Sequence, residues 1–366
     1  MHSDLVIRDT PERDGRPGIP ERELANWGEK VYKNGDNDRI ATILPEGIAV
    51  SIGDFIEKAH GALAERLHPL SDLIHTPDGG IPEKWITVVQ GPIGIHASSH
   101  PTQRDLPPDV LERRAVLITE EGEKAARGER AIHEDFRKEI LSLAVHPPEQ
   151  EGQAPQLILQ TGDTNYFTIR TLENMRLEAG RDDPGTIAKY FQNHWGMSTL
   201  VRARDDNGDP VFIFSKRSDE VDFYPGCYNV TASGSMEKRD FFENGEMNLQ
   251  QVAIREVKEE TGIRVDPSRD TIEVLGLGYN PERSDWNLQM YVRTEQQASE
   301  ILANRDQAPD AWETDGFAIV RADQPETILG YLREHQGEWT PTGTSAIYNA
   351  LCRDFGEEAV RRAWES

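Results

Sequence analysis

The sequence predicts an α+β protein in which a mixed α/β region precedes an α/β/α sandwich over residues 196–366. Three observations predict this class. The chain has 366 residues, a length suited to two domains or to one domain with a large extension. A hairpin pattern surrounds Asn207-Gly208, the favoured turn dipeptide. Strand-like runs then alternate with few helical segments, at 228–232, 271–279, 286–293 and 317–321, before a helix near 344–355.

Composition excludes several classes of partner. The chain carries 40 basic and 65 acidic residues, a net charge of −25. We therefore expect no binding to nucleic acid or anionic membrane, because both would repel it. No run approaches the ~18 apolar residues of a membrane helix, and no signal peptide is evident, so we expect a cytoplasmic protein. Cys227 and Cys352 make neither a zinc site nor a disulfide framework, although a single bridge between them stays open.

The region before residue 196 divides into three parts. We predict a flexible arm over 1–20, a mixed α/β domain of unknown role over 21–145, and a linker and connecting segment over 146–195. Within them, the pattern predicts helices at 56–67, 121–143 and near 186–195. It also predicts a strand within 84–97 near a Gly/Pro turn, and two short strands around a Gly-Asp turn within 157–171.

A capped helix is predicted over 249–261. Asn248 is a favoured N-cap, and Gln251 follows it by three residues, as in a capping box. The apolar residues of this segment fall on one stripe at helical spacing, so one side is expected to be buried. Gly262 suits the left-handed position just past a helix.

Three acids share one face of this helix. Glu256, Glu259 and Glu260 stand at i, i+3 and i+4. On a solvated face, like charges at this spacing cost only about 0.2–0.5 kcal/mol per pair. In a cleft, two charges ~4 Å apart repel by about 4 kcal/mol at an effective dielectric of ~20. A cation would then be needed, and carboxylate oxygens suit Mg²⁺ or Mn²⁺. The residues alone leave both interpretations open.

The run "REVKEETGI", residues 255–263, resembles the second half of the Nudix box, REUxEExGU with U aliphatic, at every fixed position. The first half of that box, a Gly followed after five residues by a Glu, is looser here. In "GSMEKRDFFENGE", Gly234 and Glu237 resemble the opening, and Gly245-Glu246 the closing pair, with about six residues inserted between them. The resemblance implies a Nudix α/β/α sandwich and diphosphate chemistry.

The resemblance also implies roles for individual residues. Glu256, Glu259 and Glu260 would hold the catalytic Mg²⁺ or Mn²⁺ ions, and Arg255 would orient the glutamates. Gly234 would bring a backbone carbonyl towards the metal. We also expect Glu246 to support the start of the helix.

Three further residues are candidates for the reaction. In Nudix enzymes the general base is a box glutamate or an acid on a later loop, and Glu313 is a candidate of the second kind, or else a solvated loop acid. Arg217 and Lys216 could meet substrate phosphates, or could be ordinary surface cations. Arg217 is favoured because its fork can grip a phosphate with two hydrogen bonds.

The function expected from these features is metal-dependent hydrolysis of a nucleoside diphosphate linked to a group X. The products would be a nucleoside monophosphate and a phosphorylated compound. The residues "RS…V…PG…SG" before the box are similar to those of Nudix proteins acting on nucleotide sugars, so such a sugar or a related small molecule is the expected substrate. Two alternatives are a prenyl-diphosphate isomerase or hydrolase and a nucleotide sensor without activity. The sequence is also compatible with a homodimer.

Overall fold

The computed structural model describes a defined part of the chain. The described residues are 50–51, 70, 86–90, 94–103, 106–129, 131, 136–146, 156–179, 190, 193–221, 223–242, 246–280, 283 and 285–366. The expected arm over 1–20, the helix over 56–67 and most of the helix near 186–195 lie outside them, as do residues 147–155 of the linker and connecting segment expected over 146–195.

A mixed sheet organises the second half of the protein. Within the described residues it has eight strands, in the order β12-β7-β6-β11-β10-β2, with β8 paired to β7 and β9 to β6. The β6–β11 pair is parallel and the other pairs are antiparallel. The strands are β2 (Ile86–Gln90), β6 (Trp195–Arg204), β7 (Pro210–Arg217), β8 (Tyr228–Asn229), β9 (Ala232–Ser235), β10 (Thr271–Asn280), β11 (Asp285–Gln297) and β12 (Thr314–Arg321).

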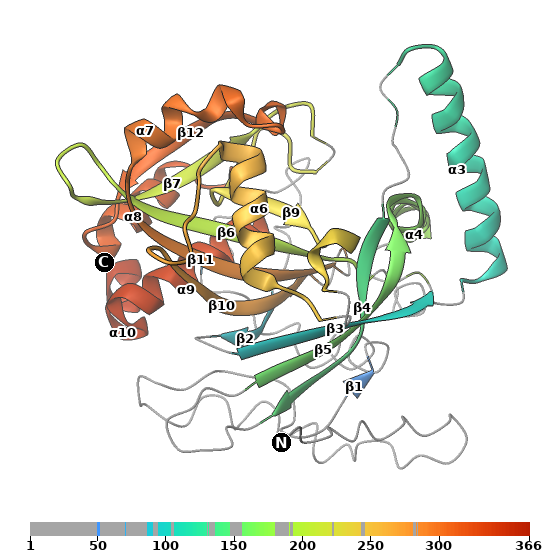
Figure 1. Ribbon diagram of the computed structural model, residues 1–366, viewed down its shortest axis with the longest axis horizontal. Coiled ribbons are helices and arrows are strands. Elements are labelled where there is room, and N and C mark those ends of the chain that lie inside the picture. The colour runs from blue at the N-terminus through green and yellow to red at the C-terminus, as the bar shows by residue number, and fades with distance from the viewer. Residues whose placement is uncertain are drawn as a thin grey trace.

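Helices cover both faces of this sheet, as the α/β/α prediction requires. Helix α6 lies on one face (Figure 1), and α8, α9 and α10 lie on the other. Alternate residues of β7 enter the two cores, because successive side chains of a strand point to opposite faces. Val211 and Ile213 join the core under α6, and Phe212 and Phe214 join the core under α8 and α9. The helices are α6 (Leu249–Thr261), α7 (Ala298–Ala303), α8 (Pro325–Glu334), α9 (Pro341–Phe355) and α10 (Glu357–Glu365).

A second sheet lies in the N-terminal half. Within the described residues its order is β1-β4-β5-β3, and helices α3 and α4 accompany it. Ile140 and Leu159 of this sheet share one core with Trp195 and Trp286 of the larger sheet. Strand β2, from the stretch predicted as an N-terminal domain, pairs with β10 in the larger sheet. The elements are β1 (Val50–Ser51), β3 (Gly94–Gln103), α3 (Pro108–Ala126), β4 (Phe136–His146), β5 (Gln156–Asn165) and α4 (Tyr166–Ala179).

Two predictions for this half are wrong. The helix predicted over 121–143 ends at Ala126, near Gly128 with φ of 73°, and its second part is strand β4. The predicted turn within 157–171 does not form, because β5 continues to Asn165 and is followed at once by α4. The Asp163 carboxylate in β5 pairs with Lys138 of β4 at 2.5 Å. Asn165 accepts a hydrogen bond from the Thr168 amide, as an N-cap does.

The later predictions agree with the structure. The strands expected over 271–279, 286–293 and 317–321 correspond to β10, β11 and β12, and the expected C-terminal helix is α9. The strand expected over 228–232 is divided into β8 and the start of β9. None of the described helices combines the length and apolar character that a bilayer crossing requires.

Candidate functional site

Helix α6 begins and ends where its sequence signals place it. The Asn248 side chain accepts a hydrogen bond from the Gln251 amide at 3.1 Å. Gly262 ends the helix with φ of 75°, in the left-handed region that glycine adopts without strain. A Cβ at this position would also lie 2.7 Å from the Asn304 carbonyl oxygen. The three acids of the motif are therefore fixed on one helix face, directed towards β9 and the loops beside it.

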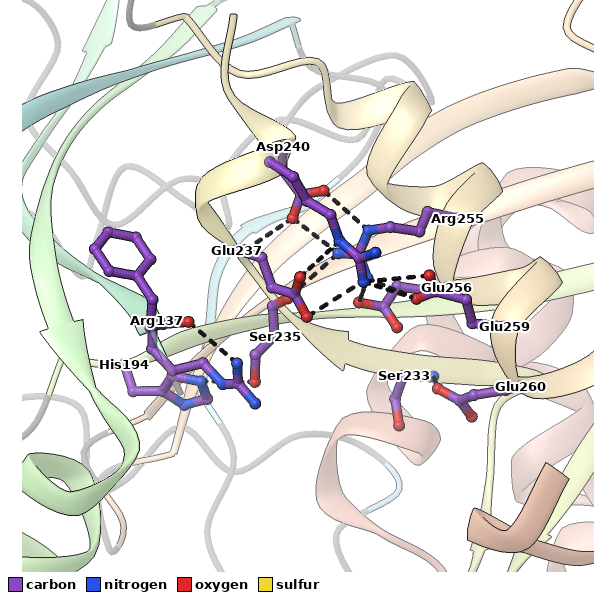
Figure 2. A network of polar contacts seen from close by, with 12 residues as sticks. Arg137, His194, Ser233, Ser235, Glu237, Asp240, Arg255, Glu256, Glu259 and Glu260 are labelled. Atoms are coloured by element: carbon purple, nitrogen blue, oxygen red, sulfur yellow. Dashed lines mark hydrogen bonds and ion pairs between the residues drawn. The ribbon is translucent and has the colours of Figure 1, made fainter. Parts of the chain in front are cut away.

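Arg255 is the centre of a carboxylate cluster (Figure 2). Its Nε and Nη2 donate to the two oxygens of Asp240 at 2.9 and 2.8 Å. Its Nη1 lies 2.8 Å from Glu256 Oε1 and 3.0 Å from Glu259 Oε2. Burial opposes the charge of this guanidinium, but the pairs with Asp240 and Glu256 outweigh burial, so the pKa of Arg255 is raised. One cation thus contacts three acids, Asp240, Glu256 and Glu259.

Asp240 is the residue that sequence reasoning missed. It lies in a short 3₁₀ turn, η3 (Lys238–Asp240), and is 5% exposed. One oxygen also accepts a hydrogen bond from the Glu237 amide at 2.8 Å. Asp240 follows Gly234 after five intervening residues, the spacing of Gly and Glu in the Nudix box. This spacing from Gly234 is the sequence signal that could have identified Asp240. The motif was instead assigned to the nearby Glu237 and Glu246.

Glu246 lies outside the cluster around Arg255. Its backbone bridges to Ser98 of β3, and its carbonyl accepts a hydrogen bond from the Phe242 amide. Its carboxylate is half exposed and 3.8 Å from Nε2 of His96. The structure therefore joins Glu246 to the N-terminal sheet and does not bring it into the cluster around Arg255. The insertion in the motif falls after Asp240, in the segment that leads to α6.

Glu256 is pressed against the backbone of β9. It is 7% exposed, and a Cβ added at Gly234 would lie 2.0 Å from its carboxyl carbon. On the paired strand β6, a Cβ at Gly196 would lie 2.8 Å from the Gly234 carbonyl oxygen. Burial raises the pKa of Glu256 to about 8, with Arg255 opposing that rise. A side chain at position 234 would therefore force the Glu256 carboxylate out of its present place.

A second group of charged side chains surrounds Glu260. It includes Glu313 and Arg217. Glu260 is 4% exposed and accepts a hydrogen bond from the Ser233 amide at 2.7 Å. Burial raises its pKa well above the usual range, and the carboxylate of Glu313 adds to the rise. Glu313 ends the 3₁₀ turn η5 (Ala311–Glu313) before β12. The guanidinium of Arg217 opposes the rise and lies 3.3 Å from the Ser233 hydroxyl.

Lys216 lies away from these acids. Its Nζ is 5.3 Å from the ring centroid of Tyr228. Lys216 and Arg217 are neighbours on β7, so their side chains point to opposite faces. Of the two cations expected to meet phosphates, the structure brings Arg217 to the acidic cluster and leaves Lys216 on the opposite face.

Glu259 is the most accessible acid of the motif. Its side chain is 20% exposed, and Arg239 lies 3.2 Å from Oε1. Its backbone carbonyl accepts a hydrogen bond from the Asp310 amide, which ties α6 to the loop before η5. Burial raises the pKa of Asp310, and the charge of Glu259 adds to that rise. Glu259 therefore faces both solvent and other acids.

The donor set suits a hard divalent cation. In the described part of the chain, no three His, Cys, Asp or Glu side chains already converge as metal ligands do. Glu256 and Glu259 turn to Arg255, and Glu260 turns to the Ser233 amide. Burial and mutual repulsion nevertheless penalise the charges of Glu256 and Glu260, a penalty that a bound cation would relieve. All these donors are oxygens, as Mg²⁺ and Mn²⁺ prefer.

Comparison with known proteins gives structural similarity alone. No protein-family model matches the chain, and no curated protein matches it at a significant level. A MutT protein from Methanosarcina mazei is 17% identical over 44% of this chain and 95% of its own, with a TM-score of 0.28. An Ap4A hydrolase from C. elegans is 13% identical over 44% of this chain and 99% of its own, with a TM-score of 0.26. A MutT/nudix family protein from Enterococcus faecalis is 10% identical over 46% and 79%, with a TM-score of 0.25.

Proposed function

We propose that the protein is a metal-dependent hydrolase of the Nudix type. Its substrate is a nucleoside diphosphate linked to a group X, and its products are a nucleoside monophosphate and a phosphorylated compound. The observation that carries the proposal is the arrangement on α6. Glu256, Glu259 and Glu260 share one face against β9, and Arg255, held by Asp240, orients the first two.

Each residue has a part in this reaction. Glu256, Glu259 and Glu260 would hold Mg²⁺ or Mn²⁺, with the Gly234 backbone beside them. A bound divalent ion neutralises the diphosphate and lowers the pKa of an attacking water. Arg255 keeps the carboxylates in place, so their geometry is set before substrate arrives. Phosphoryl and nucleotidyl transfer depend mainly on positioning and electrostatics, so few other groups are needed.

Glu313 and Arg217 complete the site. Glu313 is the proposed general base, because it stands on a loop after the motif and its charge acts on Glu260. Proximity to other acids favours a base that takes up a proton readily. Arg217 is the proposed phosphate-binding cation, since its guanidinium lies beside Ser233 and Glu260. In a chain of net charge −25, such a local cation is needed for an anionic substrate.

The substrate class is the finer part of the proposal. A nucleotide sugar or a related small molecule is preferred, on the similarity of the residues before the motif. The test is a product assay with Mg²⁺ or Mn²⁺ on nucleotide sugars, ADP-ribose, dinucleotides, nucleoside triphosphates and prenyl diphosphates. Glu259→Gln and Glu260→Gln are the controls. Release from a nucleotide sugar that both variants abolish supports the proposal, and release from prenyl diphosphates alone overturns it.

A further inference from the structure

The side chain of Ser233 lies between two parts of the proposed site. This residue is on β9, and its backbone amide donates to the carboxylate of Glu260 at 2.7 Å, as Figure 2 shows. Its hydroxyl oxygen lies 3.3 Å from Nη1 of Arg217, and the residue is partly exposed. Ser233 therefore connects the proposed phosphate-binding cation to a proposed metal ligand. The reaction proposed above makes no use of its hydroxyl.

A series of hydrogen bonds from helix α9 decides which way this hydroxyl donates. At the start of α9, the Gly343 amide donates to the Thr340 hydroxyl oxygen at 3.0 Å. The Thr340 oxygen lies 2.7 Å from Oδ1 of Asn229 and 3.4 Å from the hydroxyl oxygen of Thr342. Hydrogen bonds with an O–H donor are most often about 2.7–2.8 Å long. The Thr340 proton is therefore donated to Asn229.

The orientation of the Asn229 amide follows from this bond. Because Oδ1 accepts from Thr340, Nδ2 faces Ser233 and donates to its hydroxyl oxygen at 3.0 Å. That distance is typical of an N–H donor, at about 2.9–3.0 Å. Asn229 is 3% exposed, and a Cβ added at Gly343 would lie 2.9 Å from its Oδ1. Close packing at the start of α9 thus holds the amide in this orientation.

The hydroxyl of Ser233 retains a proton to donate. A serine hydroxyl has two lone pairs and one proton. The lone pairs accept from Asn229 Nδ2 and from Arg217 Nη1, and neither of these nitrogens can accept in return. Within the part of the chain that the structure describes, the hydrogen bonds of Ser233 include no acceptor for this proton. The proton is therefore available to a ligand.

We infer that the Ser233 hydroxyl donates a hydrogen bond to a non-bridging oxygen of the substrate's diphosphate, beside Arg217. This inference rests on the proposed function, because it takes the diphosphate to lie between Arg217 and the acids of α6. A phosphate oxygen is anionic and forms charge-assisted hydrogen bonds with such donors. A bond donated to the attacking water would instead reduce its nucleophilicity, so the diphosphate is the acceptor.

The fixed orientation also explains how a neutral group contributes to binding here. The hydroxyl is held by two donors before the ligand arrives, so little ordering is required when the bond forms. In a chain of net charge −25, the diphosphate needs specific donors as well as a cation. Ser233 would supply one such donor directly beside Arg217.

The first test measures binding without hydrolysis. The probe is methylenediphosphonate, a non-hydrolysable analogue of pyrophosphate, titrated into the whole protein with Mg²⁺ in a calorimeter. Ser233→Ala should weaken binding roughly tenfold or more, the loss typical of a hydrogen bond to a charged group. Ser233→Thr, which keeps the hydroxyl, should retain most of the affinity.

Ser198→Ala is the matched control for this test. Ser198 is the residue paired with Ser233 on β6, and its buried hydroxyl has no hydrogen-bond partner in the described structure. The same substitution there should leave binding unchanged. An equal loss in Ser198→Ala would contradict the inference, because it would indicate that the proton of Ser233 is directed into the sheet.

The second test separates contact with the ligand from support of Arg217. Ser233→Ala also removes an acceptor of the Arg217 guanidinium, so its effect is measured again in the Arg217→Gln background. A hydroxyl that contacts the diphosphate should still contribute, and the double variant should bind the probe more weakly than Arg217→Gln. Equal affinity of the double variant and Arg217→Gln would show that the serine acts only by positioning Arg217, and would overturn the inference.

The third test reverses the hydrogen bond from Asn229. In Asn229→Asp the new carboxylate only accepts, so it should attract the Ser233 proton away from the ligand. Its added charge repels the probe whether or not the hydroxyl is present, and a double-mutant cycle with Ser233→Ala removes that contribution. Asn229→Asp should weaken binding less in the Ser233→Ala background than in the wild type. Equal effects in the two backgrounds would contradict the assigned direction of the bond.

Binding and hydrolysis distinguish this inference from the proposed function. If Ser233→Ala weakens binding of the probe but no diphosphate is hydrolysed, the hydroxyl contact is supported and the hydrolase proposal is wrong. If hydrolysis occurs with the same kcat/KM in Ser233→Ala and the wild type, the inference is wrong and the proposed function stands. Absence of probe binding by the wild type would also overturn the inference.

Discussion

The guanidinium of Arg255 makes two parallel hydrogen bonds to Asp240, at 2.9 and 2.8 Å. The partner stands at the end of a 3₁₀ turn before α6, and its side chain is 3% exposed. Such a two-point, charge-assisted pair fixes direction as well as distance. It leaves Nη1 of Arg255 aimed at Glu256 and Glu259. The alignment of the acidic face thus depends on a residue outside α6.

Asp240→Asn should therefore damage both stability and activity. The substitution removes the charge of one of the three carboxylates that pair with Arg255, and removing one partner of a buried pair costs up to about 3–5 kcal/mol. We expect a large fall in the free energy of unfolding, measured with urea, and a fall in kcat. Glu246→Gln is the matched control, because its carboxylate is half exposed and lies away from Arg255. A larger effect at Glu246 than at Asp240 would contradict this assignment.

Gly234→Ala should disturb the site by contact alone. The new Cβ would lie 2.0 Å from the Glu256 carboxyl carbon, so the glutamate or the strand must move. We expect a lower melting temperature and at least tenfold lower activity, on the order of the loss from a misplaced catalytic group. Gly330→Ala in α8 is the control, since nothing lies within 4 Å of its Cβ position. That change should stabilise the protein by about 0.5–1 kcal/mol, as alanine does in exposed helices.

Glu256→Gln should stabilise the metal-free protein at alkaline pH. The pKa of Glu256 rises to about 8 in the folded state from 4.5. Between these values the folded state binds more protons than the unfolded state, so stability falls as pH rises towards 8. The glutamine variant lacks this loss. In EDTA at pH 8, its free energy of unfolding should exceed that of the wild type, and added Mg²⁺ should stabilise it less.

His194 should make the protein sensitive to acid. Its pKa falls from 6.5 to about 3, first because of burial and then because of Arg137 and Arg283. A depressed folded pKa gives stability that is present above pH 6.5 and is lost as pH falls towards 3. Unfolding of the wild type and of His194→Gln is measured at pH 7.5 and pH 5. The wild type should lose more stability than the variant over this interval, and equal losses would contradict the expectation.

The variants Arg217→Gln and Lys216→Gln should differ clearly in kcat/KM. Arg217 lies beside Ser233 and Glu260, whereas Lys216 lies over the ring of Tyr228 on the other face of β7. Loss of a charge-assisted hydrogen bond to phosphate costs about 1.5–3 kcal/mol. We expect kcat/KM to fall by roughly tenfold or more for Arg217→Gln, which that energy corresponds to. Lys216→Gln should change kcat/KM little, and the reverse order would exclude Arg217 as the phosphate-binding residue.

Local signals predicted α6 well and its surroundings poorly. Asn248 and Gly262 mark the ends of the helix in the sequence, and the spacing of the acids fixes their common face. The partner of Arg255 was missed because the insertion after Asp240 placed several acids at similar spacings. Lys216 was included because adjacent cations look equivalent until the pleat of β7 separates their side chains.

In the N-terminal half, tertiary pairing overrides local propensity. Gly162 and Asp163 have the composition of a turn, but they pair with Glu139 and Lys138 of β4 and stay extended. The sequence pattern over 121–143 predicted one continuous helix. It gave no sign that the helix ends before the turn at Gly128.

The most direct test of the central claim is the release of nucleoside monophosphate from a nucleoside diphosphate–X substrate, followed with and without Mg²⁺. Wild-type protein and Glu260→Gln are compared, because Glu260 is held by the Ser233 amide in the proposed metal site. The account predicts Mg²⁺-dependent release by the wild type and its loss in the variant. No turnover of any diphosphate, together with stabilisation of the wild type by nucleotides, would contradict it and indicate a sensor.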